Sequence, residues 1–166
     1  MSAVPASKVV PGFFRHALIT VEPIAAVTGA AICLLKPHSY TELMTQGLGA
    51  YASDTKFLYT TIAGAWLHFA FIEAVVMRAY DDLRLWRMCC AAMVLSDLLY
   101  CLSAIEAVGG WAVWSQFGNW TAHDWTVMLG TVPPASIRLC ILLGIGMKST
   151  AAARTPTIST HTSEKY

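Results

Sequence analysis

Four long apolar blocks constrain this sequence more than any other feature. They cover residues 17–35, 57–77, 88–108 and 125–147, and each is close to the roughly 20 residues that a helix needs to span a bilayer. None is a simple run of leucine and isoleucine, and nearly all contain an ionisable residue. Such helices are typical of bundles that pack around polar groups. The sequence therefore predicts an all-α fold, an integral membrane four-helix bundle.

Composition supports this prediction, because 56% of the 166 residues are apolar and only 13% are charged, whereas about a quarter are charged in a soluble domain. The alternative is a soluble bundle with unusually apolar helices. We expect one transmembrane domain over residues 17–148, preceded by an N-terminal segment at 1–16 and followed by a disordered, Ser/Thr-rich tail at 149–166. The start does not fit a signal peptide, so we expect the first helix to be retained.

Basic residues are distributed unevenly between the two ends of such a bundle. With four spans, both termini and the second loop share one side, which carries Lys8, Arg15, Arg78, Arg84, Arg87, Lys148, Arg154 and Lys165. The other side carries only Lys36 and Lys56. The positive-inside rule then places both termini in the cytosol, and the endoplasmic reticulum is the default membrane. The Trp-rich third loop is expected on the lumenal side.

Several ionisable residues fall inside the apolar blocks, where each needs a partner, a cavity or a function. They are Glu22, His68, Glu73, Asp97 and Arg138, with Glu106 and Asp124 nearer the ends and more typical of the interface. Counting residues from the cytosolic ends at about 1.5 Å each predicts two layers. Glu22 and Glu73 form a shallow layer, and His68, Asp97 and Arg138 form a deeper one.

This arrangement predicts acid–base chemistry. Two carboxyl groups in a site poor in water cannot both ionise easily, so Glu22 or Glu73 is expected to keep a proton and act as a general acid. Asp97, through His68, is expected to act as the base, and Arg138 to hold Asp97. Structural interpretations remain open for all five: a helix cap, a surface contact, an ion pair between helices, or a packing histidine.

Aromatic residues accompany the acids on two predicted helix faces. Trp66, Phe69 and Glu73 share one face of the second span, and Asp97 and Tyr100 share a face of the third. Aromatic rings beside acids suit a hydrophobic substrate and stabilise a cationic centre, although ordinary core packing is the alternative. The predicted substrate-binding residues are Trp66, Phe69, Tyr100 and Trp120.

No sequence pattern points to a cofactor or a metal. The five cysteines form no C-x-x-C pair and have no zinc spacing, so we expect them to pack as small apolar residues. The net charge of +1 argues against a nucleic-acid partner. The expected partners are a lipophilic small-molecule substrate and membrane lipids, with a homo-oligomer also possible.

A resemblance to a known family rests on a series of short motifs between residues 13 and 147. They are VEP (Val21–Pro23), Gly29, E-x4-R (Glu73 and Arg78), DLRLWR (Asp82–Arg87), LSD (Leu95–Asp97) and R-x5-GIG (Arg138 and Gly144–Gly146). Together they resemble a family of small four-helix membrane proteins of filamentous fungi, some encoded in secondary-metabolite clusters for polyketide cyclic ethers. The architecture is also similar to the sterol isomerase and sigma-2 receptor-like group.

The residues and the resemblance together suggest a membrane-embedded, cofactor-independent enzyme of fungal natural-product biosynthesis. Its expected reaction is the opening of an epoxide in a lipophilic polyketide or isoprenoid, by hydrolysis or ring closure. A proton-initiated isomerase or terpene cyclase would use the same acids. A lipid-binding or scaffold protein without enzymatic activity is a third hypothesis, in which the acids serve stability alone.

Overall fold

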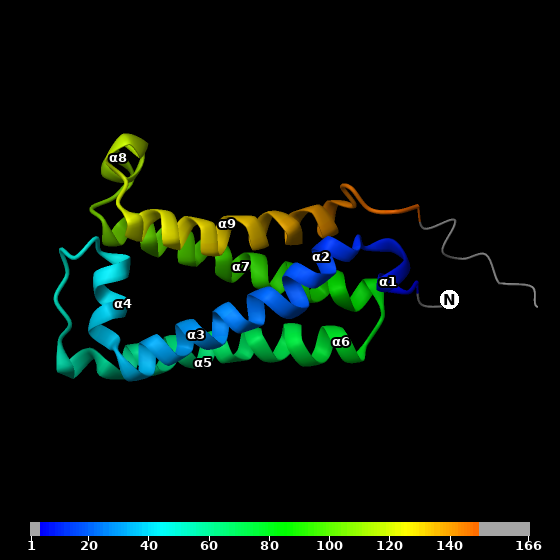
Figure 1. Cartoon of the computed structure of the whole chain (residues 1–166), viewed down its shortest axis with the longest axis horizontal. Coiled ribbons are helices and arrows are strands. Elements are labelled where there is room, and N and C mark those ends of the chain that lie inside the picture. Colours follow the sequence, from blue (N-terminus) through cyan, green and yellow to red (C-terminus); the bar gives the residue numbers. More distant parts are fainter. Residues whose placement is uncertain (1–3, 150–166) are drawn as a thin grey trace, which may run out of the picture.

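The fold is entirely helical over residues 4–149, the part of the chain that the computed structural model describes (Figure 1). Four helices are long and apolar enough to cross a membrane: Gly12–Leu35, Ser53–Ala79, Leu83–Ala107 and Ala122–Leu143. The elements are α1 (Ala6–Val9), α2 (Gly12–His16), η1 (Ala17–Val21), α3 (Glu22–Leu35), α4 (Pro37–Met44), η2 (Ser53–Thr55), α5 (Lys56–Phe71), η3 (Ile72–Val76), α6 (Met77–Ala79), α7 (Leu83–Ala107), α8 (Trp111–Trp114), η4 (Phe117–Asn119) and α9 (Ala122–Leu143). The predicted all-α class is confirmed, and no strand occurs within these residues.

Proline, polar caps and glycine set the ends of the helices. Pro37 opens α4, because proline fits the first turn of a helix but cannot continue the preceding one. Asp82 caps α7 by accepting a hydrogen bond from a backbone N–H of its first turn at 2.8 Å. Thr121 and Asp124 form a capping box that starts α9, and Gly144, with φ +75°, ends it.

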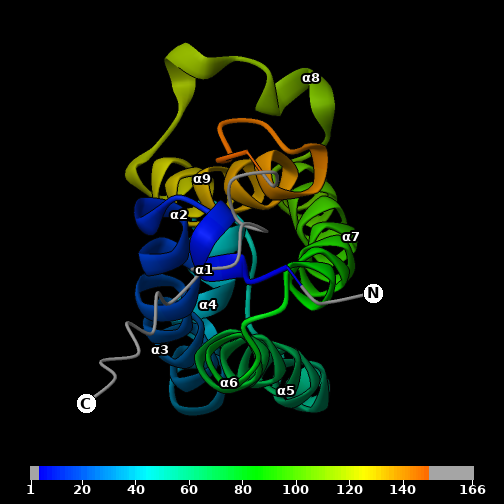
Figure 2. The same ribbon diagram turned by 90° about the vertical axis from the view of Figure 1, so that its right-hand side faces the viewer.

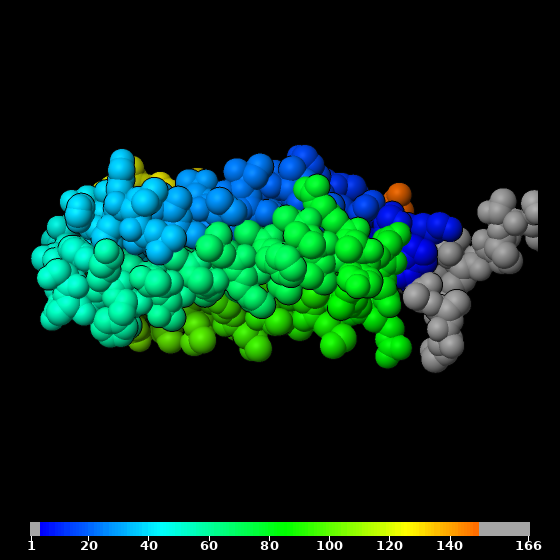
Figure 3. Space-filling view, turned by 90° about the horizontal axis from the view of Figure 1, so that it is seen from below, coloured from blue at the N-terminus to red at the C-terminus, as the bar shows by residue number. Residues whose placement is uncertain are grey.

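The long helices form two closely packed pairs. α3 lies along α5, and α7 lies along α9 (Figure 1). Viewed from one end, the two pairs stand opposite each other (Figure 2), and α3 and α5 run side by side over the face shown in Figure 3. At the end far from the chain termini, α4 contacts both α3 and α9 and so bridges the pairs.

The end of the bundle near the termini contains the main hydrophobic core. Trp86 is 1% exposed, and its Nε1–H donates to the Met77 carbonyl at 3.0 Å and the Tyr80 carbonyl at 3.2 Å. Buried residues from α1, η1, α7 and α9 surround it, among them Val9, Val10, Leu18, Cys90 and Ile141. This end is therefore a solid platform that fixes the relative positions of the helices.

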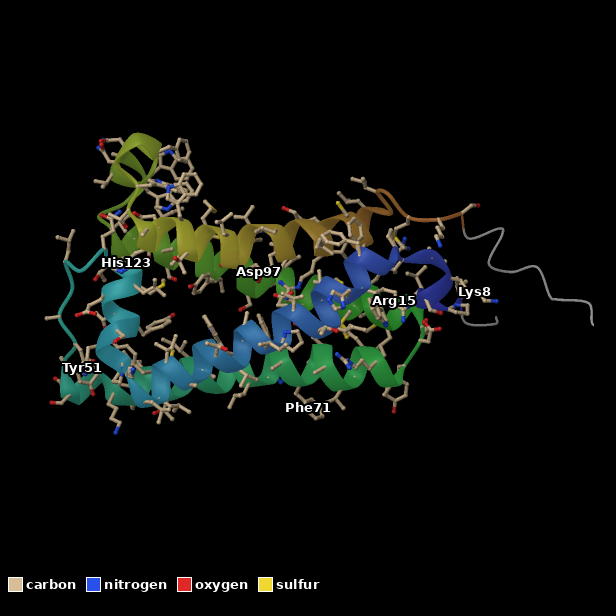
Figure 4. All side chains as sticks on the ribbon, in the orientation of Figure 1. Lys8, Arg15, Tyr51, Phe71, Asp97 and His123 are labelled. Carbon is tan, nitrogen blue, oxygen red and sulfur yellow. The ribbon has the colours of Figure 1, made fainter. Side chains whose placement is uncertain are left out.

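Large apolar side chains cover the outside of the bundle. Phe71 points away from the interior (Figure 4) and is 57% exposed. The outward-facing apolar residues include Ile24, Leu95, Leu98, Leu102 and Leu129. A soluble monomer rarely exposes such a continuous apolar surface, whereas helices in lipid require it. Together with the four candidate spans, this surface identifies the chain as an integral membrane protein.

The helix boundaries differ from the predicted ones at several places. The first long helix begins at Gly12 rather than at 17, because α2 and η1 continue directly into α3. Residues 37–56, between the first two apolar blocks, contain α4, whose Tyr40 and Thr41 are buried. The predicted tail at 149–166 lies outside the described residues, apart from Ser149.

Candidate functional site

A buried arginine binds three carboxyl groups from other helical segments. Arg138 Nη1 donates to Asp97 Oδ2 at 2.6 Å, and Nη2 donates to Glu73 Oε1 at 2.8 Å. The same Nη2 also forms an ion pair with Glu22 Oε1. Asp97 lies about midway along the bundle (Figure 4). We call these four residues the Arg138 cluster.

Two π-helical turns position the glutamates of this cluster. Glu73 lies within η3, Glu22 directly follows η1, and the two turns pack against each other. Arg78 lies in α6, which directly follows η3, and it joins this segment to η1. Its Nε and Nη2 donate to the Ile19 carbonyl of η1 at 3.1 and 2.5 Å. Single π turns within α-helices are rare and occur frequently at functional sites. Their presence on both glutamate-bearing helices indicates a specialised local geometry.

The Arg138 cluster contains more acid than base. If every group were ionised, three negative charges would face one positive charge, and burying uncompensated charge is costly. Glu22 Oε2 and Glu73 Oε2 also have no hydrogen-bond partner among residues 4–149. Protons retained on the carboxyl groups reduce both problems. We therefore expect the cluster to hold at least one exchangeable proton.

A cavity of about 620 Å³ adjoins the Arg138 cluster, a size within the usual range of small-molecule sites. Glu22 and Asp97 line it, with side chains that are 15% and 11% exposed. Glu73 and Arg138 do not line it, and both of their side chains are 0% exposed. The cavity thus receives two carboxyl groups from the cluster, while the other two members lie behind them.

Aromatic rings form much of the remaining wall. Trp66 packs against Tyr100 and Tyr40 with centroid separations of 6.0 and 6.2 Å, and all three line the cavity. The Phe69 ring lies 5.9 Å from the Arg138 guanidinium carbon. Burial raises the pKa of Tyr40, so its hydroxyl stays neutral at physiological pH. The predicted contacts Trp66, Phe69 and Tyr100 therefore reach one cavity, and Tyr40 is a wall residue that the sequence analysis missed.

A glycine on α3 makes room for this aromatic wall. A Cβ placed on Gly29 would lie 1.4 Å from an atom of the Trp66 ring. The ring therefore packs directly on the backbone of α3, and close approach through small residues is the common way for membrane helices to associate. This contact joins α3 to α5 beside the cavity.

The cavity extends between the two helix pairs toward the outer surface. Thr28 of α3 faces Thr126 and Gly130 of α9 across one side, and all three residues are exposed. Ala65 of α5 and Leu99 of α7 occupy the corresponding positions on another side and are also exposed. Among the long helices, close packing is strongest within the α3–α5 and α7–α9 pairs, so these exposed lining residues lie along the sides of the bundle between the two pairs.

The sequence matches a family model described as a domain of unknown function (DUF7704) over residues 7–148. The chain belongs to this family. The match includes the four candidate spans and every member of the Arg138 cluster. No curated protein and no solved structure matches the sequence.

The predicted division into two layers is wrong in this DUF7704 protein. Glu22 and Glu73 were expected in a shallow layer, but they share the Arg138 guanidinium with Asp97. Counting residues along straight helices failed because the arginine side chain is long and because the π turns shift the positions of both glutamates.

His68 does not join Asp97 and Arg138, contrary to the prediction. It is exposed on α5 and does not line the cavity. His68 and Glu73 are five positions apart in the sequence, which corresponds to about 140° around a helix. Because Glu73 points into the bundle, His68 is directed away from it. A proton relay from Asp97 through His68 is therefore inconsistent with the structure.

Three other candidates also lie apart from the cluster. Trp120 is in the loop after α8, where its Nε1–H donates to the Trp114 carbonyl at 2.8 Å, and it does not line the large cavity. Glu106 is exposed near the end of α7. Asp124 is buried at the start of α9, where it accepts hydrogen bonds from Gln46 Nε2 at 2.9 and 2.8 Å. These three residues form no part of the Arg138 cluster.

Proposed function

We propose that the protein is a cofactor-independent acid–base enzyme that acts on a lipophilic substrate within the membrane. One observation carries the proposal: Glu22 and Asp97 face the same cavity while one buried guanidinium binds both. Such a pair can hold one protonated and one ionised carboxyl group at a fixed separation. General acid–base catalysis requires a proton donor or acceptor held within hydrogen-bond reach of the reacting group, and this pair can supply both.

The reaction that best uses this pair is the opening of an epoxide. The protonated carboxyl of Glu22 donates its proton to the epoxide oxygen as a carbon–oxygen bond breaks. The ionised carboxyl of Asp97 accepts a proton from water, or from a hydroxyl of the substrate, as that oxygen bonds to the carbon. The product is a diol or a cyclic ether, and exchange of one proton between the two carboxyl groups restores the enzyme.

The other members of the cluster act by positioning. Arg138 orients the two reacting carboxyl groups and stabilises whichever is ionised. Glu73 binds the same Nη2 as Glu22 and is remote from the cavity, so it fixes the guanidinium. Trp66, together with the other aromatic wall residues, provides a face that stabilises positive charge developing on carbon.

The substrate and the setting follow from the apolar walls and the resemblance to fungal membrane proteins. A lipophilic polyketide or isoprenoid would enter from the bilayer through the lateral sides of the cavity. Natural-product biosynthesis at the endoplasmic reticulum is the corresponding cellular setting. The described cations at the end shared by the termini, including Arg15, Arg84 and Lys148, support a cytosolic location for that end.

Two other functions draw on specific observations. The aromatic wall beside a proton donor also suits a proton-initiated isomerase or terpene cyclase, whose intermediates are carbocations. The mainly apolar, laterally accessible cavity suits a lipid-binding protein without enzymatic activity. The first alternative predicts an isomeric product, and the second predicts that neutralising the cavity-facing acids changes no metabolite.

The test is metabolite profiling of the producing organism after deletion of the gene, followed by complementation with variants. We expect an epoxide to accumulate and the intact gene to clear it. Glu22→Gln and Asp97→Asn should each reduce clearance by about 100- to 10,000-fold, the usual contribution of acid–base catalysis. The matched control is Glu106→Gln, an exposed site on α7 that does not line the cavity. Full clearance by both cavity variants at equal protein level would exclude the proposal.

A further inference from the structure

A second cavity of about 230 Å³ lies beyond the large one, bordered by α4, α7, α8 and α9. Leu43, Val127 and Thr131 line both cavities. Three shared wall residues from two helices show that the cavities are neighbours separated only by side chains. The smaller cavity therefore extends the substrate site away from the Arg138 cluster.

The lining of the smaller cavity offers a bound molecule little but apolar contact. Ala104 and Ile105 of α7 face Met128 and Val132 of α9 across it. Its one acidic residue, Asp124, already accepts hydrogen bonds from Gln46, from the Thr121 backbone and from the Thr121 hydroxyl. No carboxylate oxygen of the smaller cavity is thus left without a protein partner, and its occupant is expected to be hydrocarbon.

The two cavities overlap along part of α7, where Cys101 lines the smaller one and Ser103 the large one, and the smaller cavity extends further from Asp97. Asp97 faces the large cavity, whereas Ala104 and Val108 line the smaller one. At about 1.5 Å per residue, Ala104 and Val108 lie about 10 and 16 Å further along the helix than Asp97. A molecule that occupies both cavities must therefore be elongated, with its polar end at Glu22 and Asp97.

We propose that the smaller cavity is a tail subsite for a substrate with a flexible hydrocarbon chain, whose epoxide end lies at Glu22 and Asp97. The identity of that end rests on the proposed function. Leu43, Val127 and Thr131 lie between the two cavities, and a thin chain requires smaller movements of these side chains than a rigid ring system would. The site consequently selects linear substrates over polycyclic ones.

The test is photolabelling of the full-length protein in lipid nanodiscs with two long-chain 1,2-epoxyalkanes. One carries a diazirine next to the epoxide, and the other carries it near the far end of the chain. We expect the first probe to label residues of the large cavity, such as Tyr100, and the second to label Met128 or Ile105. Labelling of lipid-facing positions such as Leu98 by the second probe would overturn the proposal, because the tail would then leave the protein between helices.

A matched pair of variants tests the subsite directly. Ala104→Leu fills the smaller cavity, whose wall this buried residue forms. Ala92→Leu adds the same atoms at an exposed position of the same helix, outside both cavities. We expect Ala104→Leu to abolish labelling by the far probe at Met128 and Ala92→Leu to leave it unchanged. Equal labelling in the two variants would contradict the subsite.

The two proposals fail in different ways. If both probes label as expected but remain chemically unchanged after prolonged incubation without light, the tail subsite stands and epoxide opening is wrong. If the epoxide is opened but the far probe labels the outer surface, the enzyme stands and the tail subsite is wrong. Labelling is read by peptide mass spectrometry and turnover by product mass.

Discussion

The two halves of the bundle are built in opposite ways. The half near the termini is solid: Trp86, Leu18 and Ile141 are at most 1% exposed and pack in one continuous core. The half near α4 contains both cavities, although the same long helices run through it. The Arg138 cluster lies where the two halves meet. The difference shows how a small membrane protein can keep an open site: one half supplies rigidity, and the other is left free for a ligand.

Removing the shared cation should produce the largest effect on this arrangement. Arg138→Met leaves three buried carboxyl groups without their counter-charge, and breaking a buried ion pair in this way costs about 3–5 kcal/mol. We expect a strongly lowered unfolding temperature of the purified protein in detergent. Arg84→Met, at an exposed position near the start of α7, is the control and should have little effect on the unfolding temperature. Similar stability of the two variants would show that the cluster does not hold the halves together.

A substitution in the half near α4, which contains both cavities and is called the hollow half, should disturb the cavity more than it lowers the stability of the fold. In Gly29→Ala, the new methyl group overlaps the Trp66 ring and must displace it, at a cost of about 1–3 kcal/mol. Trp66 lines the large cavity, so a displaced ring changes its shape, and labelling by both epoxide probes should fall. Gly64→Ala is the control on α5, where a Cβ has no heavy atom within 4 Å, and a helical Gly→Ala change stabilises by about 1 kcal/mol.

A substitution in the solid half should lower the stability of the fold and leave the cavities unchanged. Trp86→Phe removes the N–H that donates to the Met77 and Tyr80 carbonyls, and we expect it to destabilise the fold by about 1 kcal/mol. Photolabelling of the cavities should be unchanged, since Trp86 lines neither of them. Thermal unfolding and labelling on the same sample test this. Loss of labelling would show that the two halves are coupled.

The smallest effect is expected at Glu73, at the junction between the halves. In Glu73→Gln the amide oxygen can still accept the hydrogen bond from Arg138 Nη2. We expect turnover to fall by less than about tenfold, which corresponds to less than about 1.4 kcal/mol in activation free energy. Glu22→Gln, measured in the same assay, should fall much further. If the two variants lose equal activity, Glu73 takes part in proton transfer itself.

The sequence predicted the spans more accurately than the site. Each apolar block appears as a long helix because length and hydropathy alone specify a membrane span. The acids Glu22, Glu73 and Asp97 were recognised for the same reason, since a carboxyl group in lipid is costly. The proximity of Glu22 to Glu73 and the contact of Arg138 with Asp97 were predicted correctly. The division into two layers and the place of His68 were predicted wrongly, because depth along a helix says nothing about direction around it.

The hollow half was the least predictable part. Its walls include Tyr40 and Leu43 of α4, from a segment that reads as a polar loop. Pro37, followed by buried Tyr40 and Thr41, is the local signal of a short helix there. No local pattern in the sequence reveals that α3 and α9 are held apart, because that separation depends on α4 and on the packing of whole helices.

The π turns allow the helices to change length without turning the site away from the cavity. A π turn contains one more residue than the α-helical turn it replaces. Deleting a single residue from Ala17–Val21 would restore a regular turn, and Glu22 would keep nearly its present direction around the helix. Deleting a residue between Glu22 and Gly29, within the regular helix α3, would instead rotate these two residues by about 100° relative to each other. Among homologues, differences in length should therefore be found at the π turns rather than between Glu22 and Gly29.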